Sequence, residues 1–144
     1  MNDGGILDGL ATERPGFSMS IYNVGEKQGS YGETESKLEG RQVFKFAADN
    51  TDVEWGYQEF KDGRIVVSTL HDCSTTIHGF DAPGYNRGDL IIDVHSHPGS
   101  SDDALDEKSN HDIGRANDFR RNTPGIRIMV YIPQKPGNKK LFDQ

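Results

Sequence analysis

The chain has 144 residues, a formal net charge of −7 and a hydrophobic fraction of 33%, with 17 glycines. That length corresponds to one domain, and the acidic balance argues against nucleic acid or an anionic membrane surface as the partner, because both reward clustered lysine and arginine. The single cysteine excludes an internal disulfide, and no stretch approaches the roughly 20 apolar residues of a membrane span.

The N-terminal segment is rich in residues that interrupt regular structure. Residues 1–16 contain four glycines and one proline but few apolar anchors, so we expect a flexible arm or linker there and a single domain over residues 17–144. The segment has neither a basic start nor a long apolar run, so no signal peptide is predicted. The chain is therefore expected to be cytoplasmic, or to be secreted as part of a larger translocated chain.

The first part of the domain combines one clear strand with an ambiguous segment. Residues 17–24 alternate apolar and polar side chains, which predicts a half-buried strand. Residues 25–40 are polar and interrupted by glycine, with at most a short helix over residues 33–38. Residues 43–50 are either a short strand or the end of a helix.

A hairpin is predicted over the next twenty residues. Apolar and polar side chains alternate in residues 51–60, which predicts a strand with Glu54 on the face opposite Trp55. An Asp-Gly pair at 62–63 is a hairpin turn signal, and residues 65–70 are rich in β-branched side chains, as expected of the partner strand.

The second half indicates a strand, a helix and a strand. Residues 71–89 are polar and form a longer segment than most connections between secondary-structure elements, so we expect a surface loop with a functional role. An apolar strand ends at His97, a helix is predicted over residues 103–121, and a second buried strand over residues 126–132, followed by a loop-like basic tail. This order predicts an α/β or α+β fold with one central mixed sheet flanked by helices.

The end of the apolar strand and the helix after it carry a candidate metal site. His95 and His97 are two residues apart on a strand, so they project from the same side. Ser109 and Asp112 are three residues apart on the predicted helix and share a face. Two imidazoles and one carboxylate are the ligand count of a catalytic zinc site, which keeps its fourth position for water. Zinc lowers the pKa of a bound water, so that the water can attack an amide carbonyl. The Ser109 hydroxyl is placed to donate a hydrogen bond to the oxyanion that then forms.

This order, His-Ser-His-Pro at 95–98 followed by Ser-x-x-Asp at 109–112, resembles the JAMM (MPN+) zinc metalloproteases. The resemblance implies a cytidine-deaminase-like JAMM/MPN architecture, zinc held by His95, His97 and Asp112, and oxyanion assistance by Ser109. The spacer 98–108 has eleven residues where the family usually has seven, and an exposed loop tolerates such an insertion. Ser100 and Asp103 also fit Ser-x-x-Asp, but they follow His97 too closely for a helix to turn back.

The resemblance further implies an upstream glutamate as the general base. Glu54 and Glu59 are the candidates, and we favour Glu54. Glu59 differs from it by an odd number of residues, so the two side chains face opposite sides of one strand.

Together with the histidine motif, residues 46–60 most resemble the JAB-like toxin domains at the C-terminal ends of bacterial polymorphic toxins, including those with Rhs repeats. The likeness covers about residues 41–132. It implies a zinc-dependent metallopeptidase or isopeptidase acting as a toxic effector, with a protein or peptide substrate and an immunity protein as partner. The alternative is a non-catalytic MPN-type protein-binding module with a structural or vestigial metal site.

Overall fold

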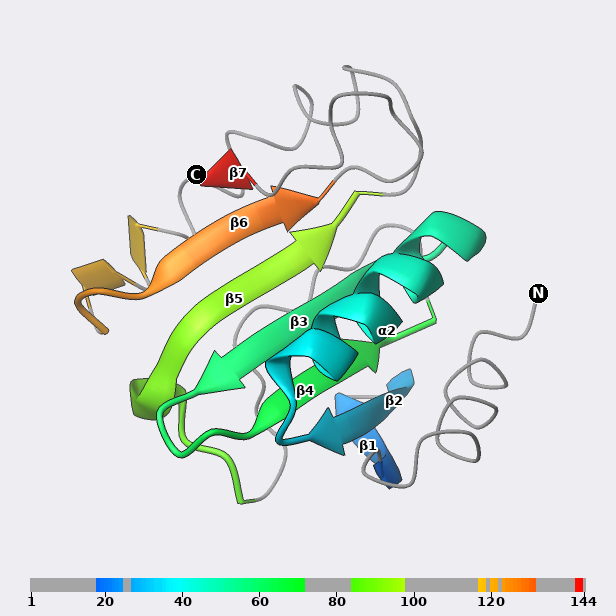
Figure 1. Ribbon diagram of the computed structural model, residues 1–144, viewed down its shortest axis with the longest axis horizontal. Coiled ribbons are helices and arrows are strands. Elements are labelled where there is room, and N and C mark those ends of the chain that lie inside the picture. The colour runs from blue at the N-terminus through cyan, green and yellow to red at the C-terminus, as the bar shows by residue number, and fades with distance from the viewer. Residues whose placement is uncertain are drawn as a thin grey trace.

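The protein is built on one mixed β-sheet with a helix packed on one face (Figure 1). A computed structural model describes residues 18–24, 27–71, 84–97, 117–118, 120–121, 123–131 and 142–143. The strands are β1 (Ser18–Val24), β2 (Lys27–Thr34), β3 (Trp55–Phe60), β4 (Ile65–Thr69), β5 (Leu90–Ser96), β6 (Arg127–Tyr131) and β7 (Phe142–Asp143). The helices with described bounds are α2 (Lys37–Asn50) and the short 3₁₀ helix η1 (Arg87–Asp89). Residues 117–118 and 120–121 are also helical, whereas the rest of the predicted helix 103–121 lies outside the described residues.

The sheet has the order β1-β2-β4-β3-β5-β6-β7. Strands β5 and β6 are parallel, and the other neighbouring strands are antiparallel. This arrangement confirms the predicted α+β class with a mixed sheet. In the described part of the chain no helix is long and apolar enough to cross a membrane.

Four sequence-predicted features appear at or close to their expected positions. The strand predicted near the N-terminus is β1, although Ile21, which the prediction placed on its apolar face, is 65% exposed. The hairpin is formed by β3 and β4. Gly63 in the hairpin turn has a φ of 93°, a conformation that favours glycine. The two buried strands of the second half are β5 and β6.

The segment between the first strand and the hairpin differs from the prediction. Residues 33 and 34 belong to β2 and not to a short helix. Helix α2 spans Lys37–Asn50, so the second alternative for residues 43–50, the end of a helix, is confirmed. Ser36 caps the helix, because its hydroxyl accepts a hydrogen bond from the Glu39 amide at 3.2 Å. The two residues form the Ser-x-x-Glu pattern of a capping box, which is the signal that the prediction overlooked.

Strand β2 was not predicted because its sequence, KQGSYGET, lacks apolar alternation. Antiparallel pairing with β1 on one side and β4 on the other fixes it as a strand. The predicted loop-like tail also needs correction, since Phe142–Asp143 form the short strand β7 beside β6. Both cases are tertiary pairing that overrides weak local preference.

Two apolar clusters cover the two faces of the sheet. On the α2 face, helix residues including Val43, Phe44 and Ala47 pack on Trp55, Tyr57 and Val94. The opposite face carries the second cluster, which consists of Phe60, Val66, Leu70, Leu90, Ile126 and Ile128. Side chains therefore alternate between two faces of the sheet. We call the face covered by α2 the helix face and the opposite face, on which His95 and His97 lie, the histidine face.

Candidate metal centre

The candidate site begins at the end of β5, an interior strand of the sheet. This strand pairs with β3 on one side and β6 on the other, and its last four residues are all buried. The pairing extends one residue past the strand, because the His97 amide donates to the Tyr131 carbonyl at 3.0 Å. His95 and His97 are 1% and 0% exposed, so both imidazoles are enclosed by the surrounding protein.

The structure brings the two imidazoles together. The Nε2 atoms of His95 and His97 lie 2.9 Å apart, and the rings are inclined by 49°. Zinc–nitrogen bonds of about 2.0–2.1 Å at a near-tetrahedral angle would separate the two nitrogens by roughly 3.3 Å. A small outward shift of the rings would therefore let both nitrogens bind one ion, so this donor pair fits zinc.

Glu54 directly precedes β3 and is 2% exposed. Its carbonyl accepts a hydrogen bond from the Thr69 hydroxyl at 2.8 Å, which fixes the backbone at this point. Gly56 pairs with His95, so extending the same register by two residues places Glu54 opposite His97. By the alternation along a strand, the Glu54 side chain belongs to the histidine face.

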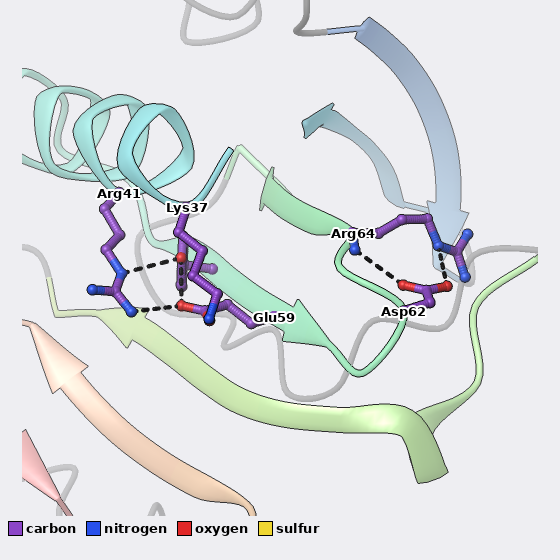
Figure 2. A network of polar contacts seen from close by, with 6 residues as sticks. Lys37, Arg41, Glu59, Asp62 and Arg64 are labelled. Carbon is purple, nitrogen blue, oxygen red and sulfur yellow. Dashed lines mark hydrogen bonds and ion pairs between the residues drawn. The ribbon is translucent and has the colours of Figure 1, made fainter. Parts of the chain in front are cut away.

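Glu59, the other candidate base, lies on the helix face (Figure 2). Its carboxylate accepts hydrogen bonds from Arg41 at 2.9 Å and from the Tyr57 hydroxyl at 2.6 Å. Burial alone raises the pKa of the Glu59 carboxyl, but these hydrogen bonds and the charges of Arg41 and Lys37 outweigh burial and lower the pKa. Glu59 is thus engaged in joining α2 to the sheet, on the side away from the histidines.

A polar pair next to the histidines was not predicted. Gln58 and Asp93 face each other across β3 and β5, and the Gln58 amide Nε2 donates to Asp93 Oδ1 at 2.8 Å. Asp93 stands two residues before His95, so both side chains lie on the histidine face. The available signal was a charged residue within the apolar run of a strand expected to be buried on both faces.

The remaining predicted site residues lie outside the described residues. These are Ser109 and Asp112, together with the spacer 98–108 and most of the loop 71–89. Within the part of the chain that the structure does describe, no group of three or more His, Cys, Asp or Glu side chains could hold an ion. The described portion of the site is therefore the histidine pair with Glu54 placed opposite it in the register.

A comparison with known families identifies a related family. A family model described as JAB-like toxin 1 matches residues 32–118, which is more than half of the 144 residues and includes β3, β4, β5 and both histidines. No curated protein matched the chain. No solved structure matched it either.

Proposed function

The chain belongs to the JAB-like toxin 1 family, and from this membership we propose that it is a toxin effector domain that hydrolyses an amide bond with the help of zinc. The observation that carries the proposal is the buried contact between the Nε2 atoms of His95 and His97 at 2.9 Å. Paired imidazoles at the end of an interior strand, with a glutamate beside them, are a donor set suited to a catalytic divalent ion.

The protein's own residues have distinct roles in this proposal. His95, His97 and Asp112 would hold the ion. Zinc, when bound, supplies Lewis acidity, which lowers the pKa of water towards about 7 and polarises a carbonyl group. The Glu54 carboxylate accepts a proton from the attacking water and passes it to the departing amine.

Ser109 completes the proposed reaction by donating its hydroxyl hydrogen to the carbonyl oxygen as negative charge develops there. We propose a protein or peptide substrate, because the histidine motif resembles that of the JAMM metalloproteases, which hydrolyse amide bonds. As in other toxin systems, the producing cell would need an immunity protein, and we propose such a protein as the partner.

The second candidate function is a non-catalytic MPN-type binding module with a structural ion. Both candidates use the histidine pair, but only the hydrolase needs the carboxylate of Glu54. Substituting Glu54→Gln preserves size and hydrogen bonding while removing the base, so it separates the two functions.

The test is inducible expression of the full chain in bacteria, with growth and the zinc content of the purified protein measured in parallel. We expect wild type to arrest growth and Glu54→Gln to permit growth while still holding zinc. Glu59→Gln is the matched control, because it alters a buried glutamate of the same strand on the other face and should remain toxic. Arrest by Glu54→Gln with zinc bound would contradict hydrolysis and favour the binding module.

A further inference from the structure

A buried polar pair lies on the histidine face, two residues along the strands from His95. Gln58 and Asp93 are paired residues of β3 and β5, both are 0% exposed, and 2.8 Å separates Gln58 Nε2 from Asp93 Oδ1. This pair takes no part in the reaction proposed above. It therefore needs an explanation of its own.

Stability does not explain the pair. Val66 of β4 is the neighbour of Gln58 and Ile128 of β6 is the neighbour of Asp93, and both are fully buried. The Gln58 carbonyl Oε1 is also buried and has no hydrogen-bond partner among the described residues. Burying an unsatisfied amide oxygen among apolar side chains costs stability, which a methionine or leucine of similar size would avoid. The Gln58 side chain is nevertheless an amide, and its nitrogen donates a hydrogen bond to Asp93.

The position of Asp93 relates it to the histidines. Asp93, His95 and His97 are successive residues on one face of β5, and a two-residue step along a strand is about 6.6–7 Å. Within the described residues no group of three His, Cys, Asp or Glu side chains could hold one ion, so Asp93 is not a third ligand beside the histidine pair. It is close enough for its charge to act on a cation, since attraction between charges is strong in a buried, poorly polarisable environment.

We propose that Asp93, held in place by Gln58, is a positioning residue of the metal centre, whose buried negative charge increases the affinity of the His95–His97 pair for a divalent cation. Carboxylates that accept the second ring N–H of a histidine ligand change metal affinity roughly 10–100-fold. Asp93 is proposed to act through its charge alone, so we expect an effect at the lower end of that range, about 10-fold. This inference rests on the proposed function, because it assumes that the histidine pair binds an ion.

The test measures the zinc affinity of the full chain by competition with a chromophoric chelator, and the thermal midpoint of the metal-free protein. Asp93→Asn removes the charge, but its side-chain oxygen still accepts the Gln58 N–H. We expect zinc affinity to fall about 10-fold while the midpoint of the metal-free protein is unchanged or higher. A purely structural role would lower the midpoint and leave the affinity of the folded protein unchanged.

Two further variants make the result decisive. Gln58→Met removes the hydrogen bond and the unsatisfied carbonyl but leaves Asp93, so we expect a smaller loss of zinc affinity without loss of stability. Glu59→Gln is the matched control, because it removes a buried carboxylate of β3 from the helix face, and its zinc affinity should equal that of wild type.

Wild-type affinity in Asp93→Asn would overturn the inference, as would an equal loss of affinity in Glu59→Gln. If Asp93→Asn does not fold, wild-type affinity in Gln58→Met would overturn it. If the wild-type chain itself fails to bind zinc, the proposed function fails together with the inference. Zinc binding by wild type with no effect of Asp93→Asn refutes the inference alone.

Discussion

Arg41 and Glu59 form an ion pair across the boundary between α2 and the sheet, with 2.9 Å between Arg41 Nη2 and Glu59 Oε2 (Figure 2). The Glu59 side chain is 1% exposed, whereas the Arg41 side chain is 48% exposed. The Tyr57 hydroxyl donates to the same carboxylate oxygen, and Lys37 Nζ lies 3.6 Å from the other one. The N-terminal half of α2 is thus fixed to β3 by one buried carboxylate.

Replacing this carboxylate should destabilise the fold without disturbing the metal centre. Glu59→Gln weakens the hydrogen bonds from Arg41 and Tyr57, and we expect a loss of about 1–3 kcal/mol in the free energy of unfolding. Urea denaturation followed by circular dichroism measures the loss. Arg41→Met should cost at least as much, because it leaves the Glu59 charge buried without its main partner. If both variants were as stable as wild type, Glu59 would not anchor α2.

The same carboxylate should make stability depend on pH. The pKa of Glu59 is lowered in the folded protein, because the hydrogen bonds and positive charges outweigh burial. Its stabilising contribution is therefore present above the unfolded-state pKa of about 4.3 and is lost as pH falls through the lower folded-state value. The difference in unfolding free energy between wild type and Glu59→Gln should be constant from about pH 7 to 5 and shrink below about pH 4. A difference that grew on acidification would show the opposite sign of pKa shift.

Gly40 should be intolerant of any side chain. A Cβ atom built at Gly40 would lie 2.5 Å from Ile65 Cγ2 and 3.3 Å from Tyr57 Cε2. Alanine gains about 1 kcal/mol in helix propensity over glycine, but forcing α2 away from the sheet costs about 1–3 kcal/mol. We therefore expect Gly40→Ala to lower the thermal midpoint.

The matched control is Gln42→Ala, at an exposed position of the same helix. That change should leave the midpoint close to the wild-type value, since surface substitutions usually have small effects. A wild-type midpoint in Gly40→Ala would mean that the helix and sheet separate easily at this contact.

The helix cap offers a further check on how α2 begins. Ser36 accepts a hydrogen bond from the Glu39 amide at its hydroxyl, so Ser36→Ala should cost about 1 kcal/mol of unfolding free energy. Ser36→Asp keeps an acceptor and places a negative charge at the helix N-terminus, so it should retain most of the stability. Equal stability in the alanine and aspartate variants would rule out a capping role.

The strands that could be predicted from sequence are those with a clear hydrophobic pattern of their own. Strand β5 has a continuous apolar run and β3 has clear alternation, and both were predicted. Strand β2 and the short β7 carry no such pattern, because their neighbours in the sheet determine their pairing. The start of α2 was missed because Gly40 weakens the helical pattern, although that glycine is needed for the close approach to Ile65.

In the candidate site, too, the features with a local sequence pattern were predicted and those set by pairing between strands were not. The step of two residues between His95 and His97 predicted that they share a face, and the structure places their Nε2 atoms together. The odd separation of Glu54 and Glu59 predicted opposite faces, and the structure places Glu59 against α2. The Gln58–Asp93 pair depends on the register between β3 and β5, which no local pattern in the sequence specifies. Ser109 and Asp112 lie outside the described residues, so their roles stay predictions.

The zinc content of the purified chain tests the central claim most directly. After saturation with zinc and removal of excess, we expect elemental analysis to find about one ion per wild-type chain, and almost none in the double variant His95→Ala, His97→Ala. His71→Ala is the control, because His71 is an exposed histidine hydrogen-bonded to Ser30 and should not alter the zinc content. Wild type without zinc, or a double variant that binds as much as wild type, would contradict the account.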